Sequence, residues 1–184
     1  ALYNALRENE NVVCLFIFDT NILSQLENKE DKRVEFILQS LELMQHELTQ
    51  HGTSLLVLHG NPVEIYGQLN PKAVYTNHDY EPYARKRDEE VKTILNANRI
   101  EFNTFKDQVI FETLEVLKDN GEPYTVFTPY SKKWKAKLNS FYLKSYPTEK
   151  YFSNFKKIAP LPLPSLAAIG FKSTGAAFPE RIIK

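Results

Sequence analysis

The chain has 184 residues, of which 42% are hydrophobic and 25% are charged, and its formal net charge at pH 7 is zero. This composition is that of a soluble globular protein, and the length fits about one domain. The single cysteine, Cys14, excludes a disulfide framework within the chain and favours a reducing, cytoplasmic setting. No apolar run approaches the length of a membrane span, so we expect no membrane partner.

The charge is divided unevenly along the chain. Residues 1–130 contain 12 Lys and Arg against 21 Asp and Glu, whereas residues 131–184 contain 11 against 2. A basic segment of this kind can face a polyanion or an acidic protein surface, or it can be solvated. Taken alone, the segment favours solvated lysines on a helix and a tail.

Apolar periodicity predicts helices and strands in alternation. In chain order these are helix 1–9, strand 11–19, helix 31–51, strand 54–59, helix 63–69, strand 73–76, helix 81–98 and strand 99–105. The first two strands are continuous apolar runs, which are typical of parallel strands buried on both faces. Alternating strands and helices connect through right-handed crossovers. The sequence therefore predicts an α/β fold, a Rossmann-like doubly wound parallel sheet with helices on both faces and one strand missing.

The region after the fourth predicted strand is less regular. Residues 107–111 are expected to form a loop, and Pro129 is expected to open a helix that runs to about residue 141. The buried stripe of that helix would consist of Trp134, Leu138, Phe141 and Tyr142. From residue 145 onward, repeated prolines predict an extended polyproline-like linker, and residues 170–184 show no packing period.

Charged residues crowd the end of the third predicted strand. Asp79 and Glu81 stand before a predicted helix, where the helix dipole favours acids, and Pro82 suits the first helical position. Residues 20–23 form a polar exit loop at the carboxyl end of the first strand. Ligands of open α/β sheets bind outside the carboxyl ends of the strands. The alternative reading is a helix cap beside a solvated basic face.

The sequence contains none of the common catalytic or phosphate-binding motifs. It has no Gly-x-Gly-x-x-Gly, no Gly-x-x-x-x-Gly-Lys-Ser/Thr, no Gly-x-Ser-x-Gly and no His/Cys cluster at metal spacing. His59 and His78 are expected at strand ends, where turn residues are more common than catalysts. We therefore expect no catalytic residue and no metal ligand, and a binding domain rather than a self-sufficient enzyme.

Several stretches resemble the amino-terminal antenna domain of the DNA photolyase/cryptochrome family. They are residues 16–23, 33–34, 55–62, 77–88 and 126–134, and the most specific is Asn77-His-Asp-Tyr-Glu-Pro-Tyr-Ala-Arg-Lys-Arg-Asp88. The resemblance covers about residues 1–140 in the family's order. It implies an antenna domain over residues 1–144 that lacks its first, central strand. Residues 145–184 would then be a Pro-rich linker toward an absent carboxy-terminal, helical FAD-binding domain.

The resemblance also implies a function. The chain would be the light-harvesting domain of a deoxyribodipyrimidine photolyase and would pass excitation from a second chromophore to FAD in the absent domain. Its partners would be its own carboxy-terminal FAD domain and, through the full-length protein, damaged DNA. Two alternatives remain: the same domain of a cryptochrome blue-light photoreceptor, or a stand-alone nucleotide-binding α/β module.

The pattern Asp-x-Glu-Pro-Tyr-x-Arg-x-Arg-Asp at residues 79–88 is similar to that of deazaflavin-binding family members. Folate-binding members have Asn-Glu where Tyr83-Ala84 stand, so folate fits less well. FMN is a fair substitute for a deazaflavin in the same pocket, and an empty pocket is a further alternative. On this similarity the cofactor-binding candidates are Asp19, Arg33, Asp79, Glu81 and Arg85.

Overall fold

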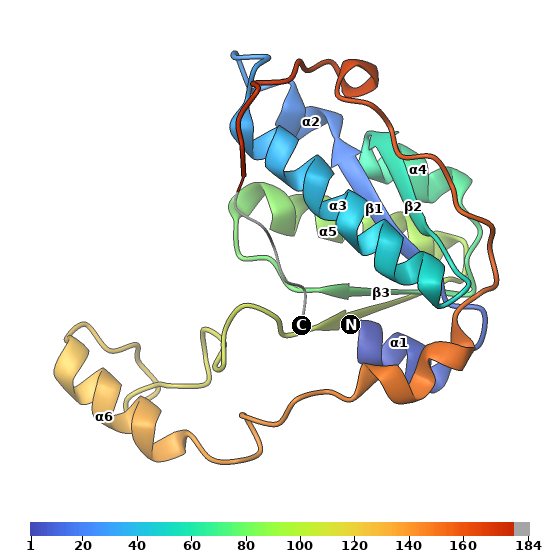
Figure 1. Cartoon of the computed structure of the whole chain (residues 1–184). Helices are drawn as coiled ribbons and strands as arrows, with labels where there is room; N and C mark the ends of the chain where they lie inside the picture. The colour runs from blue at the N-terminus through green and yellow to red at the C-terminus, as the bar shows by residue number, and fades with distance from the viewer. Residues whose placement is uncertain (179–184) are drawn as a thin grey trace.

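The computed structural model describes residues 1–178 and has an α/β fold (Figure 1). The strands are β1 (Cys14–Asp19), β2 (Leu55–Gly60), β3 (Ala73–Asn77) and β4 (Glu101–Phe105). The helices are α1 (Leu2–Glu8), α2 (Thr20–Leu23), α3 (Lys32–Gln50), α4 (Pro62–Gln68), α5 (Pro82–Ala97) and α6 (Phe127–Lys137), with 3-10 helices η1 (Thr148–Asn154) and η2 (Ala167–Ile169). The predicted alternation of strands and helices through residue 105 is confirmed.

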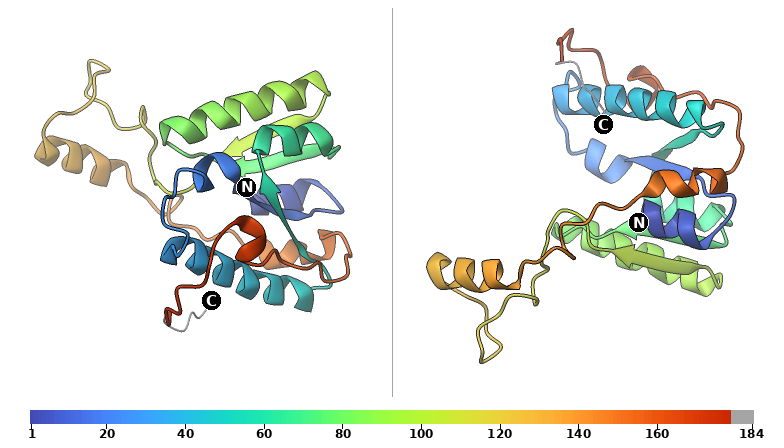
Figure 2. Two further views of the ribbon diagram at one scale, coloured as in Figure 1. Left: turned by 90° about the horizontal axis from the view of Figure 1, so that it is seen from above. Right: turned by 60° about the horizontal axis from the view of Figure 1, so that its bottom comes forward.

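The strands form two parallel pairs. β1 pairs with β2, with Cys14 opposite Leu55, and β3 pairs with β4, with Ala73 opposite Glu101. Within residues 1–178, β1 and β3 do not pair with each other. Figure 2 shows α3 on one side of the β1–β2 pair and α4 and α5 on the other. The doubly wound, parallel architecture with helices on both faces is confirmed. No strand of the described chain connects β1 to β3, so each keeps one unpaired edge.

Local hydrogen bonds set the starts of the helices. Asp31 caps α3 by accepting from the backbone N–H of Arg33 at 2.8 Å, as its position before the helix predicts. Residues 20–23, which we expected to form a loop, make the single-turn helix α2. This expectation was wrong because the Asp19 carboxylate accepts from the backbone N–H of Asn21 at 2.9 Å and so caps a helical turn.

Two apolar clusters form the core. One lies between α5 and the β3–β4 pair and contains Val74, Val91, Leu95 and Ile100. The other lies between α3 and the β1–β2 pair and contains Phe18, Leu23, Val34, Leu38, Leu41, Leu55, Val57, Ile169 and Phe171. The last two come from the segment after η1, which returns across α3 (Figure 1).

Part of the segment expected to be a linker is thus built into the core. The backbone N–H of Leu161 donates to Ser54 Oγ at 2.9 Å, and Ile169 and Phe171 are buried. The prolines exclude a helical period here, so the sequence shows no packing pattern, yet single apolar side chains still fill core positions. Residues 179–184 of the same segment lie outside the described part of the chain.

The region around α6 departs most from expectation. The helix ends at Lys137, none of its residues is buried, and Phe141 is 73% exposed. Trp134 and Tyr142 are half-buried against the ring of Phe111. The predicted buried stripe was wrong: Phe111 covers Trp134 and Tyr142 only in part, and Phe141 stays exposed. We call residues 106–146 the arm, since they extend away from the two strand pairs (Figures 1 and 2).

Candidate functional site

The carboxyl ends of the strands and the first turns of α3 and α5 lie along one side of the molecule, on the left in Figure 1. β1 ends at Asp19, β3 ends at Asn77, and α5 begins five residues later at Pro82 with Glu81 as its N-cap position. Parallel strands bring their exit loops to one edge, which is where ligands of such folds bind. Most of the candidate residues belong to this edge.

Asp19 connects the end of β1 to the start of α5. Its side chain is buried, and the Tyr83 hydroxyl donates to Asp19 Oδ2 at 2.7 Å. Asn21 Nδ2 in turn donates to the Tyr83 hydroxyl at 3.1 Å. Burial, followed by the hydrogen bond to Asp19, raises the pKa of Tyr83, so the phenol stays protonated and acts as a donor. The link fixes the position of α5 relative to β1.

Tyr83 is not among the site residues predicted from the sequence. It stands inside the charged motif and is the residue that carries the contact between the two elements. Its position between the candidate residues Glu81 and Arg85 indicates that it lies near the site. Its partner could not be read from the sequence, because residue 19 is 64 positions away.

The first turn of α5 has no capping side chain. Asp79 Oδ1 accepts from the backbone N–H of Glu81 at 3.1 Å, which closes the turn before the helix. Glu81 is exposed and makes no side-chain capping hydrogen bond. The backbone N–H groups of a helix's first turn have no partners inside the helix, and the helix dipole adds partial positive charge there. Such an end is suited to a phosphate or carboxylate group.

The two candidate arginines differ in how they are placed. Arg85 is exposed on the first turn of α5 and makes no ion pair with any residue of the described chain. Arg33 is held at the start of α3 by two hydrogen bonds from Nε to the carboxylate of Asp31. The hydrogen bonds from the Arg33 side chain lower the pKa of Asp31 to about 2. Arg85 therefore has a free guanidinium for an anionic group, whereas that of Arg33 is already paired.

Taken together, the structure brings Asp19, Asp79, Glu81 and Arg85 to one edge, and no described contact joins Arg33 to them. Their chemistry fits a ligand that carries several hydroxyls and an anionic tail. Carboxylates accept from hydroxyls, and an arginine and a helix N-terminus bind phosphate or carboxylate oxygens. A flavin-type chromophore with a ribityl chain and a phosphate has both features, so the residues present fit that class.

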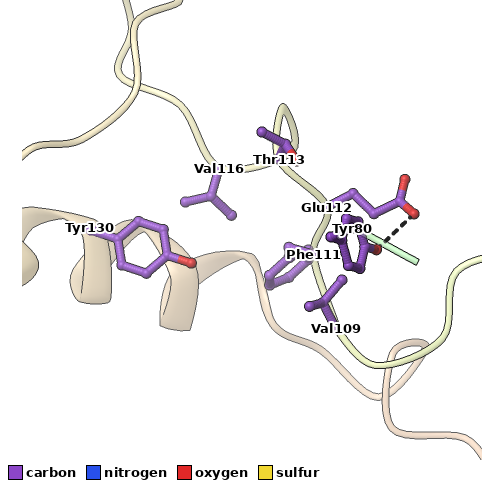
Figure 3. Close-up of a pocket in the computed structure, with 7 residues that line it drawn as sticks. All are labelled: Tyr80, Val109, Phe111, Glu112, Thr113, Val116 and Tyr130. Carbon is purple, nitrogen blue, oxygen red and sulfur yellow. Dashed lines mark hydrogen bonds between the residues drawn. The ribbon is translucent and has the colours of Figure 1, made fainter. Parts of the chain in front are cut away.

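A separate pocket lies where the arm leaves the strands (Figure 3). It is open to solvent, has a volume of about 290 Å³, and is lined by Tyr80, Val109, Phe111, Glu112, Thr113, Val116 and Tyr130. The Tyr80 hydroxyl donates to Glu112 Oε1 at 3.1 Å across its rim. None of the five candidate residues lines this pocket.

His78 joins the β3–α5 loop to the arm. Its Nδ1 is hydrogen-bonded to Glu112 Oε1, and its Nε2 lies 2.9 Å from Thr104 Oγ1. The hydrogen bond with His78, ahead of the one from Tyr80, lowers the pKa of Glu112. These contacts assign His78 a role in holding the base of the arm, which agrees with the expectation that it is a turn residue.

Cys14 at the start of β1 has the environment expected of a core side chain. It packs against the cluster beneath α3, and burial raises the pKa of its thiol to about 11. Residues 1–178 contain no group of three or more His, Cys, Asp or Glu that could hold a metal ion. Among the helices of the same residues, none is both long enough and apolar enough to cross a membrane.

The family model for DNA photolyase matches residues 1–151. The deoxyribodipyrimidine photo-lyase of a Synechococcus species is 32% identical over 178 residues, covering 91% of this chain and 36% of the relative. An uncharacterised 31.6 kDa Synechococcus protein is 32% identical over 180 residues, or 95% of this chain and 62% of the relative. Cryptochrome-1 of Erithacus rubecula is 24% identical over 125 residues, or 66% of this chain and 20% of the relative.

Among solved structures, an archaeal photolyase from Sulfolobus tokodaii superimposes with a TM-score of 0.64 at 26% identity, covering 75% of this chain and 32% of that one. That structure holds two FAD molecules and implies a novel light-harvesting cofactor. The chain thus spans about a third of the length of the two photolyases, 36% and 32%.

Proposed function

The chain belongs to the DNA photolyase family, and we propose that it is the amino-terminal light-harvesting domain of a deoxyribodipyrimidine photolyase. In this proposal it binds a second chromophore and passes excitation to FAD in a carboxy-terminal domain outside this chain. The full-length protein would then repair pyrimidine dimers in DNA, in the cytoplasm. The similarity to the Synechococcus photolyase and to the two-FAD photolyase of Sulfolobus tokodaii supports this assignment.

The observation that carries the proposal is the hydrogen bond between Tyr83 and Asp19 at 2.7 Å. It holds the uncapped start of α5 beside the carboxyl end of β1, where a nucleotide-like ligand of this fold binds. Arg85 and the first turn of α5 would hold a phosphate or carboxylate tail, and Asp19, Asp79 and Glu81 would accept from ribityl hydroxyls. A deazaflavin, FMN or FAD has this chemistry, and when bound it would supply absorption of light.

The residues at this edge would act by binding and orienting only. Energy transfer between two pigments requires a fixed distance and orientation and no bond making in this domain. The link from β1 to α5 supplies rigidity, since it joins two elements that are each packed in the core. The candidate residues can therefore hold a pigment without a nucleophile or a base.

The proposal is tested by the substitutions Glu81→Ala and Arg85→Ala in the full-length protein, with Glu90→Ala on α5 as the matched control. We expect the first two to lower the amount of second chromophore per FAD, measured by absorption of the purified protein. A charge-assisted hydrogen bond is worth about 1.5–3 kcal/mol, so the Kd of the Arg85 variant should rise by roughly 10-fold or more. Both side chains are exposed, so melting temperatures should be unchanged. Equal uptake by all four proteins would reject the site.

A cryptochrome photoreceptor is the second candidate, because cryptochrome-1 proteins match 66% of this chain. The two functions differ in what the full-length protein does with light. Blue-light repair of a pyrimidine dimer in an oligonucleotide supports the photolyase. A full-length protein that undergoes flavin photoreduction and leaves the dimer intact would favour the photoreceptor.

A further inference from the structure

The outer side of α3 carries exposed apolar side chains. Among residues 1–178 and outside the arm, seven large apolar side chains are exposed, and four of them lie on this helix: Phe36, Ile37, Leu43 and Met44. They are between 37% and 44% exposed, whereas Val34, Leu38 and Leu41 on the inner side are buried in the core. Figure 1 shows α3 at the surface of the molecule, in front of the β1–β2 pair. A second apolar stripe on a surface helix usually marks an interaction site.

The outer stripe of α3 is symmetric about Ser40. At about 100° per residue, its four apolar side chains lie within about 60° of Ser40 around the helix. Phe36 and Met44 stand four residues before and after Ser40. Ile37 and Leu43 stand three residues before and after it. Such a face matches a second copy of itself when the two helices run antiparallel and cross at Ser40, where the small side chain allows a close approach.

The charged residues at the two ends of this face are complementary under the same symmetry. Arg33 and Glu47 stand seven residues before and after Ser40, so Arg33 of one copy meets Glu47 of the other. Glu47 is exposed and has no ion pair with any residue of the described chain. The Arg33 side chain is 73% exposed, and only its Nε and Nη2 donate to Asp31. A guanidinium has five N–H donors, so Arg33 can also bind a second carboxylate.

We propose that this face of α3 is the contact between two copies of the protein, which are related by a two-fold axis at Ser40. Phe36 of each copy then packs on Met44 of the other, and an ion pair between Arg33 and Glu47 closes each end. The Phe36 ring also meets Phe178, with 5.6 Å between centroids, so the carboxy-terminal segment borders the contact. No pigment takes part, so the inference does not depend on the proposed function.

Sedimentation velocity of the full-length protein measures this association. One helix pair makes a small interface, so we expect a dissociation constant of roughly 1–10 µM and a dimer at about 50 µM. Met44→Lys places an ammonium group in the apolar contact and should raise the dissociation constant by about ten-fold or more. Ile22→Lys is the matched control, because Ile22 on α2 is also 44% exposed but lies outside the face, and it should change nothing. A monomeric wild type at this concentration would overturn the proposal.

A charge swap tests the antiparallel arrangement. Glu47→Arg alone brings two arginines together at each end of the contact and should raise the dissociation constant by about three- to ten-fold. Combining it with Arg33→Glu restores the pairs with the charges exchanged and should return the constant to within about two-fold of the wild type. The control Glu42→Arg changes an exposed residue about 160° around the helix from Ser40 and should have no effect. No recovery in the combined variant would overturn the antiparallel arrangement.

Other occupants of the face give different results. If the full-length protein dimerises but Met44→Lys leaves the dissociation constant unchanged, the copies meet through another surface and the proposal is wrong. If the protein stays monomeric and hydrogen peroxide does not oxidise Met44, another part of the same polypeptide covers the face, and the proposal is also wrong. These measurements require neither light nor pigment. A dimer that lacks the second chromophore would therefore reject the proposed function and support the contact through α3.

Discussion

Tyr83 is the residue on which the geometry of the candidate site depends most. Its hydroxyl is shared between Asp19 and Asn21, and Asp19 is buried. Removing the donor leaves a buried carboxylate with one hydrogen bond fewer, which is more costly than the loss of an exposed contact. The residue therefore matters both for stability and for the placement of α5.

We predict that Tyr83→Phe lowers the free energy of unfolding by about 1–3 kcal/mol, because it leaves an unpaired buried acceptor. Tyr75→Phe is the matched control, since the Tyr75 hydroxyl donates to the exposed Glu8 at 3.2 Å. Its loss should cost less than about 0.5 kcal/mol. Urea denaturation of both variants measures the difference, and equal stabilities would show that the link to Asp19 is not stabilising.

Among contacts between elements, Glu35 on α3 is hydrogen-bonded to residues 173–174 near the carboxy-terminal end of the described chain. Its carboxylate accepts from the Ser173 hydroxyl at 2.6 Å and from the Thr174 backbone N–H at 3.0 Å. The hydrogen bond from Ser173, followed by those from Thr174, lowers the pKa of Glu35 below its usual 4.5. A carboxyl whose pKa is lower in the folded state stabilises the fold above the unfolded pKa and loses that effect as the pH falls through the folded pKa.

We predict that the stability difference between the wild type and Glu35→Gln is largest above pH 5 and shrinks as the pH falls below 4.5. Gln keeps the shape and can accept one hydrogen bond, but it lacks the charge that titrates. Denaturant unfolding of both proteins at pH 7 and pH 3.5 gives the comparison. If the stability difference between the two proteins does not change with pH, the contact of Glu35 with Ser173 and Thr174 does not depend on the ionised carboxylate.

β1 and β3 each have one edge that pairs with no strand of the described chain. β1 is an apolar run typical of strands buried on both faces, yet only Phe18 and Asp19 at its end are buried. We propose that the first strand implied by the family resemblance lies between β1 and β3. The Ala1 nitrogen lies 2.7 Å from Asn77 Oδ1, at the carboxyl end of β3, so a strand placed before Ala1 would end at the correct edge.

We therefore predict that an apolar, β-branched strand of about six residues, joined to Ala1 through a short loop, raises the melting temperature of the chain. It would satisfy backbone groups on both edges and cover apolar surface of β1. The control is the same extension with two prolines in the strand, which removes the backbone donors. If both extensions give the same melting temperature, no strand occupies this position.

Across the whole molecule, the sequence predicted the helices and strands that depend on patterns of neighbouring residues. Periodicity located α3 and α5, the apolar runs located β1 and β2, and Asp31 and the charged motif marked helix starts. The family match over residues 1–151 confirms the resemblance drawn from those motifs. Such patterns do not show which distant segment each helix, strand or loop packs against.

Three features illustrate that limit. The bond from Tyr83 to Asp19 spans 64 positions, and the bond from Ser173 to Glu35 spans 138. The stripe that includes Trp134 has the period of a packed helix, but among the described residues it packs against the loop residue Phe111 and not against either core cluster. Periodicity shows that a face is meant to be covered, and only the three-dimensional structure shows by what.

The proposed light-harvesting role is tested most directly by the action spectrum for dimer repair by the purified full-length protein, recorded beside its absorption spectrum. We predict a second pigment in addition to FAD, and a repair rate that follows the absorption of that pigment as well as that of the flavin. A protein that contains FAD alone and repairs dimers with an action spectrum matching FAD alone would contradict it.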